Sequence, residues 1–157
     1  MNLVVQGAPL APDTLQALRA AAGATAVIPL GTHACRLDNA HHTLPLIYFE
    51  EARAAYWREV AGRSGVEDVD YVIGEAQVRF HQRIRYPARL EVGVRVSRIG
   101  GKSFVMEYEL RSAEGELLAT GRTVQVMYDY AAGRSIPVPP DLKERILAFE
   151  GEIAGEA

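Results

Sequence analysis

Residues 90–110, LEVGVRVSRIGGKSFVMEYEL, decide the fold, because apolar and polar side chains alternate along them on both sides of a turn sequence. Leu90, Val92, Val94 and Val96 occupy every second position before the turn, and residues 104–110 repeat this period. A period of two is typical of a β-strand with one buried face. The Gly-Gly-Lys sequence at 100–102 is typical of a tight hairpin turn. The stretch therefore predicts an antiparallel hairpin with one apolar face.

The same alternation continues on both sides of this hairpin. Residues 71–84 supply one strand, and LLATGRTVQVMYDY at 117–130 supplies a last, long one. The apolar side of the first of these strands consists of Val72, Ala76, Val78, Phe80 and Ile84. Turn sequences at 86–89 (YPAR) and 112–116 (SAEGE) separate the strands. We therefore expect an antiparallel meander of four strands with one apolar face.

Residues 44–61, LPLIYFEEARAAYWREVA, change the period from two to 3.6 and predict a long helix. Pro45 is compatible with a first helical turn, and Thr43 is a candidate N-cap. Phe49, Ala52, Tyr56 and Val60 fall on one stripe, at helical spacing. The opposite side is less polar than that of a surface helix, which predicts a helix covered on more than one side.

A strand at 25–37, a long helix and four antiparallel strands predict an α+β fold in which the sheet wraps around the helix. Shorter helices are expected at 11–23 and, opened by prolines and Asp141, at 139–157. We thus divide the chain into an N-terminal helical extension (1–24), a main domain (25–137) and a C-terminal helix (138–157).

Composition limits the classes of protein to which the chain can belong. It has 157 residues, 48% of them hydrophobic and 24% charged, with a net charge of −3, which predicts one soluble globular domain. No apolar run is long enough to span a membrane, and the N-terminus is a poor signal peptide. The absence of a basic cluster argues against nucleic acid as a partner. The single cysteine, Cys35, fits a reducing compartment, so we expect a cytoplasmic protein.

Two stretches carry a resemblance to a known family: YFEEARAAYW (48–57), which follows an Asp-containing loop, and RIRYPARLEVGVRVSRIGGKSFVMEYELRSAEGELLATGRTVQVMYD (83–129). They resemble hotdog-fold acyl-CoA thioesterases of the 4-hydroxybenzoyl-CoA thioesterase type, over roughly residues 25–137. The resemblance implies a hotdog fold, an antiparallel sheet wrapped around a long central helix. It further implies a dimer or tetramer that hydrolyses an acyl-CoA, with this thioester as substrate and no cofactor.

The resemblance also implies a catalytic aspartate in the loop before the central helix. Asp38 and His42 reproduce the family's Asp-to-His spacing, whereas an alignment without a gap places Cys35 at the aspartate position. Asp38 can activate water or attack the carbonyl, and His42 or His41 can bind the substrate or orient the acid. The alternative is that Asp38 is a turn or capping residue and the histidines are solvated. No ligand spacing accompanies the histidines, so we expect no metal site.

Thioester hydrolysis also needs hydrogen-bond donors for the oxyanion that forms at the carbonyl. Free N–H groups at the start of the central helix are suited to this task. Pro45 lacks an N–H group, so Leu44 and Leu46 are expected to supply the donors. Tyr48 completes the substrate-binding set that we assign to this helix.

Glu50 and Glu51 lie on the central helix, where a second group of hotdog thioesterases places its catalytic carboxylate. Glu50 is therefore a second candidate base, because burial on a covered helix would raise its pKa. The alternative is an ion pair between Glu50 and Arg53. Arg83 and Arg85, with Arg89 just past the turn, are candidates for binding coenzyme A phosphates, or else they only keep a sheet edge soluble.

Two other functions remain open from the sequence. A non-catalytic acyl-CoA-binding protein would keep the fold after its active loop had changed, as the Cys35 alignment and Pro45 suggest. An enoyl-CoA hydratase or dehydratase is the less favoured alternative, because residues 38–42 (DNAHH) match that signature only loosely. Open strand edges also predict a homodimer on physical grounds, while the homotetramer is implied by the resemblance alone.

Overall fold

The computed structural model describes residues 2–6, 26–29, 42–63, 69–85, 89–151 and 153, the first two ranges as backbone only. The elements are, in chain order, β1 (Asn2–Gln6), β2 (Ala26–Pro29), α2 (Leu44–Glu59), β3 (Tyr71–Phe80), β4 (Arg89–Ile99), β5 (Ser103–Ser112), β6 (Leu117–Asp129), β7 (Arg134–Ser135) and α3 (Pro140–Glu150). The chain groups into two compact units. Unit 1 comprises Met1–Ala55, Val78–Val94 and Tyr108–Gly121, and unit 2 comprises Tyr56–Gln77, Arg95–Glu107 and Arg122–Ala157.

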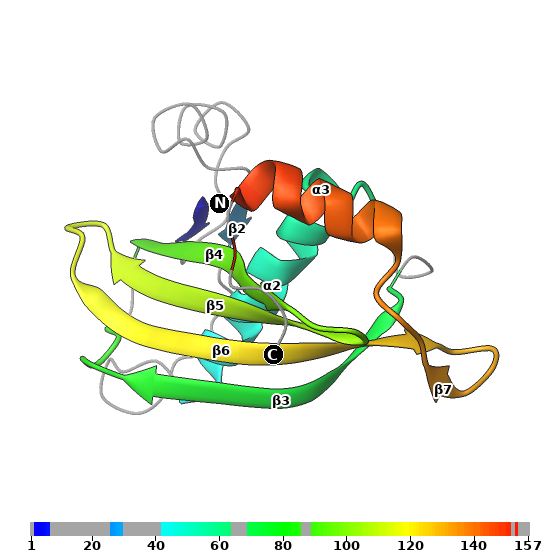
Figure 1. Cartoon of the computed structure of the whole chain (residues 1–157). Helices are drawn as coiled ribbons and strands as arrows, with labels where there is room; N and C mark the ends of the chain where they lie inside the picture. Colours follow the sequence, from blue (N-terminus) through cyan, green and yellow to red (C-terminus); the bar gives the residue numbers. More distant parts are fainter. Residues whose placement is uncertain are drawn as a thin grey trace. The chain divides into compact units, whose positions relative to one another are not determined.

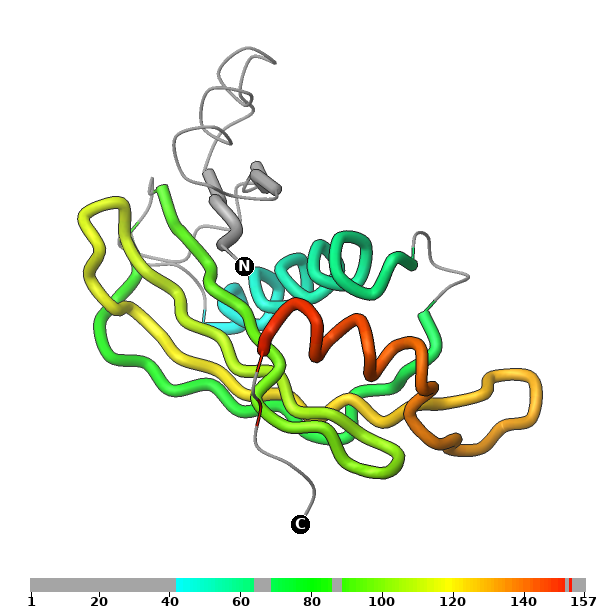
Figure 2. The backbone as a smooth tube through the Cα atoms, turned by 45° about the horizontal axis from the view of Figure 1, so that its top comes forward, coloured from blue at the N-terminus to red at the C-terminus, as the bar shows by residue number. Residues whose placement is uncertain are grey.

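The strands form one sheet with the order β2-β1-β4-β5-β6-β3, and β7 pairs with β6 (Figure 1). The predicted hairpin is confirmed, because β4 and β5 are joined by a turn at residues 100–102 (Figure 2). In this turn the Gly100 N–H donates to the Ser103 carbonyl at 2.7 Å. The simple meander is wrong in one respect, because β3 lies beside β6 and not beside β4. Alternation reveals that a strand has two different faces, but it does not reveal the strand with which it pairs.

β3 also differs from its expected burial. Tyr71 packs on Trp57 and Phe104 in the core of unit 2, whereas Phe80, on the predicted apolar side, is 50% exposed. Of that predicted side only Ile84, beyond the end of β3, is buried. β3 is the last strand in the sheet order, and an edge strand is less completely covered than a central one.

α2 forms over the predicted residues, and its predicted stripe is buried. Phe49, Ala52 and Tyr56 are 0% exposed and Val60 is 6% exposed. Burial extends beyond this stripe to the other side of the helix, where Ala55 is 0% exposed, and to Arg53 and Trp57, at 7% and 3%. Ile47, at 46% exposed, lies on the strip that stays open. The expected cover on more than one side is therefore confirmed.

Unit 1 packs the first part of α2 on β5 and β6. The Phe49 ring stacks on Tyr108, with 4.6 Å between ring centroids. Gly121 of β6 lies directly against Phe49, because a Cβ atom at this position would overlap the ring. The glycine thus serves the close approach of helix and sheet.

Unit 2 packs the last turn of α2 on aromatic side chains and on α3. Trp57 stacks on Phe104 at 5.5 Å and meets Tyr71 edge-on at 4.9 Å. The Tyr56 hydroxyl donates to Glu150 of α3 at 2.8 Å, and the same carboxylate oxygen accepts the Val96 N–H at 2.8 Å. Burial and the Glu150 contact raise the pKa of Tyr56. α3 is the predicted C-terminal helix, and it ends at Gly151 with φ of 78°.

The N-terminal residues differ from the expected helical extension where they are described. β1 pairs antiparallel with β4, with Leu3 opposite Val92, and parallel with β2, with Val4 opposite Val27. Residues 2–6 thus belong to the sheet, while the helix expected at 11–23 lies outside the described residues. None of the described helices has the length and apolar character that a membrane crossing requires.

Candidate functional site

The start of α2 presents fewer free donors than the sequence predicts. The Leu46 N–H donates to the Thr43 carbonyl at 3.1 Å, so it is not available to an oxyanion. Pro45 has no N–H group. Of the predicted pair, Leu44 is thus the remaining candidate, because no bond from its N–H group to another described residue is found.

The side chains of the first helical turns divide into a buried and an open group. Leu46 and Ile47 are 39% and 46% exposed, and they form an apolar surface at the start of the helix. Tyr48 is 1% exposed, and burial raises its pKa to about 12. The Tyr48 side chain is therefore buried among the core residues, and its role in binding the substrate stays a prediction. The open apolar surface is formed by its neighbours instead.

The candidate acids and histidines are only partly placed. Asp38, His41 and Cys35 lie outside the described residues. His42 is exposed and lies, with Thr43, in the turn that leads into α2. Glu50 and Glu51 are both exposed, so the burial that would make one of them a base is not present among the described residues.

Arg53 is a buried cation, whereas the sequence indicates it only as an ion-pair partner of Glu50. Its side chain is 7% exposed and donates from Nη1 to the Tyr108 hydroxyl at 3.3 Å. Burying a guanidinium is costly unless polar partners compensate it. A charged residue flanked by alanines at positions 52, 54 and 55 was the available signal for an unusual environment.

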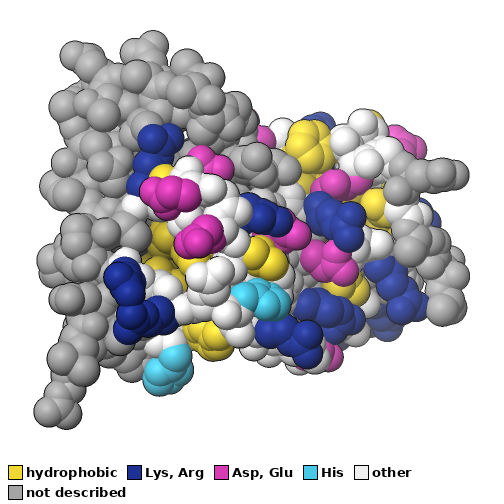
Figure 3. Space-filling model, turned by 90° about the vertical axis from the view of Figure 1, so that its left-hand side faces the viewer, with side chains coloured by type: hydrophobic (Ala, Val, Ile, Leu, Met, Phe, Trp, Pro, Cys, Tyr) yellow, Lys and Arg dark blue, Asp and Glu magenta, His cyan; other side chains and the backbone are white. Residues whose placement is uncertain are grey.

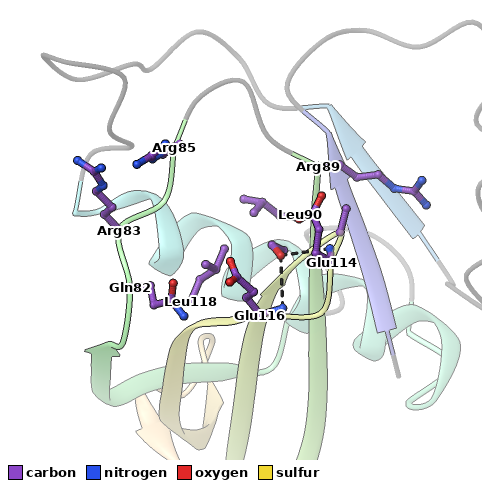
Figure 4. Close-up of a pocket in the computed structure, with 10 residues that line it drawn as sticks. Gln82, Arg83, Arg85, Arg89, Leu90, Glu114, Glu116 and Leu118 are labelled. Atoms are coloured by element: carbon purple, nitrogen blue, oxygen red, sulfur yellow. Dashed lines mark hydrogen bonds between the residues drawn. The ribbon is translucent and has the colours of Figure 1, made fainter.

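Arg83 and Arg85 line a cavity of about 470 Å³ in unit 1, as do side chains from the β5–β6 turn (Figure 4). The other lining residues come from the end of β3, the start of β4 and that turn: Gln82, Arg89, Leu90, Ser112, Ala113, Glu114, Glu116 and Leu118. The His81 and Gln82 N–H groups both donate to the Leu118 carbonyl, at 2.9 and 3.1 Å, and thereby join two of these segments. In Figure 4 the Arg89 side chain extends away from the cavity.

The surface around this end of the strands carries both signs of charge. Figure 3 looks onto the side where the β5–β6 turn lies and shows Lys and Arg side chains with Asp and Glu between them. Two carboxylates, Glu114 and Glu116, line the same cavity as the arginines. Neither is among the candidate residues predicted from the sequence, because residues 112–116 are recognisable there only as a turn. Their one available signal was the pair of acidic residues in that turn.

Among the described residues, no three histidine, cysteine, aspartate or glutamate side chains are close enough together to hold a metal ion.

A family model describes most of this fold. The model of the Thioesterase-like superfamily matches residues 39–146, from the segment before α2 into α3. The chain belongs to the Thioesterase-like superfamily. The hotdog fold that the resemblance implied is thereby confirmed, together with its α+β class.

Individual proteins are also similar to this thioesterase-like chain in sequence or structure. A thioesterase from Thermus thermophilus, solved in complex with coenzyme A and Zn, is 29% identical, with a TM-score of 0.68 over 77% of this chain and 88% of that one. A predicted thioesterase from Bacillus stearothermophilus shares the fold, with 18% identity and a TM-score of 0.70 over 94% of this chain and 96% of that one. The Bacillus subtilis (strain 168) uncharacterized protein YsmA is 26% identical over 107 residues, which cover 68% of this chain and 73% of YsmA.

Proposed function

We propose that this thioesterase-like chain hydrolyses acyl-CoA thioesters at the start of α2. The observation that carries the proposal is the open apolar surface of Leu46 and Ile47 in the same compact unit as the arginine-lined cavity. The apolar surface suits an acyl chain, and Arg83 and Arg85 suit the phosphates of coenzyme A. A relative solved with coenzyme A adds support.

The proposed reaction needs a carboxylate at the thioester carbonyl. Asp38, or Glu50 in its place, takes a proton from water while the water oxygen bonds to the carbonyl carbon. The Leu44 N–H and the positive end of the helix stabilise the oxyanion that forms. The C–S bond then breaks, the carbonyl is restored, and the proton passes to the leaving thiolate. If Asp38 attacks the carbonyl carbon directly instead, the C–S bond breaks, the thiolate of coenzyme A leaves, and an anhydride forms between the acyl group and Asp38. Water then hydrolyses this anhydride, which releases the acid, restores the Asp38 carboxylate and supplies the proton for the thiolate.

We further propose that the active form contains a second copy of the chain. β3 ends the strand order of the described sheet, and Ile73 and Phe80 on it are 42% and 50% exposed. An exposed edge strand with large apolar side chains is a template for pairing with another chain. Light scattering during size-exclusion chromatography should show a dimer or tetramer, and a monomer at all concentrations would contradict this.

The test of hydrolysis is the release of free thiol from a panel of acyl-CoAs. Either Asp38→Asn or Glu50→Gln removes the catalytic base. The variant that does so should lower kcat by about 10²-fold or more. Glu144→Gln on the exposed side of α3 is the matched control and should leave the rate unchanged. Undiminished turnover in both site variants would refute the assignment of the carboxylate.

An acyl-CoA-binding protein without catalysis is the second candidate. It is favoured by the engagement of the Leu46 N–H and by the exposure of both helix glutamates. Tight binding of acyl-CoA without thiol release over the whole panel would support this candidate over the hydrolase.

A further inference from the structure

The edge of β4 is covered by a strand over only part of its length. Among the described residues, β1 pairs with β4 from Arg89 to Gly93, where Asn2 lies opposite Gly93. β4 continues to Ile99, so its second half, residues 94–99, extends past the last of these pairs. At about 3.3 Å per residue this half is about 20 Å long, the length of a typical strand. It needs a cover other than β1, because an exposed edge is a template for pairing with another chain.

The helix α3 lies along this second half of β4 (Figure 2). Just before the helix, the Val138 N–H donates to the Gly101 carbonyl at 3.0 Å, and at the end of the helix Glu150 accepts a hydrogen bond from the Val96 N–H at 2.8 Å. The 11 residues of α3 span about 16 Å, and the strand from Val96 to Gly101 spans about 17 Å. Helix and strand thus run side by side, and α3 is the cover of this part of the edge.

Glu150 latches this cover with one carboxylate oxygen. Its Oε1 accepts hydrogen bonds from the Val96 N–H and the Tyr56 hydroxyl, each at 2.8 Å, so it joins α3 to the strand edge and to α2. The same residue weakens its own helix, because a negative charge at the C-terminal end opposes the helix dipole. α3 has no basic side chain in its last turn to offset this charge, and a helix of 11 residues is marginal in isolation. Tertiary contacts therefore hold α3 in place, and Glu150 supplies the contact to the strand edge.

An uncovered second half of β4 is suited to pairing with the same segment of another copy. The Val96 N–H points out of the sheet, toward Glu150. In an antiparallel ladder, two Val96 residues placed opposite each other across a two-fold axis can therefore exchange both of their backbone hydrogen bonds. In that register Arg95 lies opposite Ser97, and Arg98 lies opposite Val94. No two arginines face each other, so the repulsion between like charges directly opposite is avoided.

We propose that α3 is a cover latched by Glu150, and that release of the latch opens the second half of β4 to antiparallel pairing with β4 of a second copy. This contact differs from the pairing proposed through β3, because β3 ends the strand order on the opposite side of the sheet. A chain that pairs through both edges forms assemblies larger than a dimer. The closed latch thus limits assembly, and it does so independently of any hydrolytic activity.

Amide hydrogen exchange of the full chain tests the latch. In Glu150→Ala the Val96 amide should exchange at least about tenfold faster than in the wild type, because it has lost a hydrogen bond to a charged group. The Met127 amide, which donates to the Lys102 carbonyl at 2.9 Å, reports the stability of the sheet and should be accelerated clearly less. Glu144→Ala removes the same charge from an exposed position on α3 and should change neither rate. If Glu150→Ala does not fold, Glu150→Gln replaces it, with a smaller acceleration at Val96.

Light scattering at increasing protein concentration tests the pairing. Glu150→Ala should form species of higher mass than the wild type, in a proportion that rises with concentration. Ser97 is half-buried on β4, and Ser97→Lys would place a cation opposite the second copy's Arg95 in the proposed register. Adding Ser97→Lys to Glu150→Ala should therefore return the mass to that of the wild type, whereas adding Ser97→Ala should not.

Three results would overturn the proposal. An unchanged exchange rate at Val96 would mean that Glu150 does not latch the cover, and an equal acceleration at Val96 and Met127 would mean that Glu150 only stabilises the fold as a whole. A mass equal to that of the wild type at every concentration, or a higher mass that Ser97→Lys leaves unchanged, would mean that the second half of β4 does not pair as proposed.

Discussion

The two ends of α2 differ in what surrounds them. At the end of the helix, Trp57 is 3% exposed and lies against Phe104 and Tyr71. At the start, Leu46 and Ile47 are 39% and 46% exposed. Large apolar side chains that a chain leaves exposed together often mark a binding surface. The comparison suggests that the end around Trp57, the closed end, stabilises the fold. The start around Leu46 and Ile47, the open end, is available to a substrate or a second copy.

Truncation at the closed end should have the largest effect on stability. Trp57→Ala removes the stacking on Phe104 and the edge contact with Tyr71, and we expect a loss of about 3 to 5 kcal/mol in the free energy of unfolding. Urea denaturation measures it, with Trp57→Phe as the control that should lose clearly less. A loss below about 1 kcal/mol would show that this end is not the packed one.

A smaller loss is expected where helix and sheet approach most closely. Gly121→Val places a side chain where the Phe49 ring lies, and overpacking of this kind costs about 1 to 3 kcal/mol. Gly101→Ala, whose Cβ would meet nothing within 4 Å, is the matched control and should change the denaturation midpoint little. Equal midpoints for both variants would contradict the close approach.

The contact between α2 and α3 should contribute less to the free energy of unfolding than the packing around Trp57 or Gly121. Glu150→Gln keeps the size of the side chain and removes its charge. The charged oxygen accepts hydrogen bonds from the Tyr56 hydroxyl and the Val96 N–H. We expect a loss of about 1 kcal/mol in the free energy of unfolding. Glu144→Gln, exposed on the same helix, should show none. A Glu150→Gln variant as stable as the wild type would mean that these bonds contribute nothing net.

The closed end of α2 could be predicted from the sequence, and the open end only in part. The stripe of Phe49, Ala52, Tyr56 and Val60 follows from helical spacing, because a core-facing helix must bury one side. Helical spacing does not show which backbone donors are already engaged, as the Leu46 N–H is by Thr43. The sequence predicts the burial of Phe49, which lies on the stripe. It does not predict the burial of the neighbouring Tyr48, which lies outside the stripe.

The cavity could not be predicted as a whole, because its lining comes from segments that only the strand pairing brings together. Arg83 and Arg85 were identified because cations near a strand end suit a phosphate. Glu116 was missed because a turn sequence does not reveal the cavity that it borders. The exposure of β3 was missed for a related reason: whether an edge strand is covered depends on its neighbours and not on its own period.

The variant that tests the open end most directly is Leu46→Glu. An acidic side chain in the first helical turn interacts favourably with the helix dipole, so the free energy of unfolding should be unchanged or higher by up to about 1 kcal/mol. The same charge opposes an oxyanion at the helix start, and kcat/KM for acyl-CoA hydrolysis should fall by at least about 10-fold. Leu46→Gln, without the charge, should retain more of the activity.

The decisive quantity is kcat/KM for thiol release from an acyl-CoA by Leu46→Glu, measured beside Leu46→Gln and the wild type. If the open end is the site of hydrolysis, kcat/KM falls selectively in the charged variant while stability is retained. Equal kcat/KM values in all of them would place the chemistry elsewhere and contradict the functional difference between the two ends of α2.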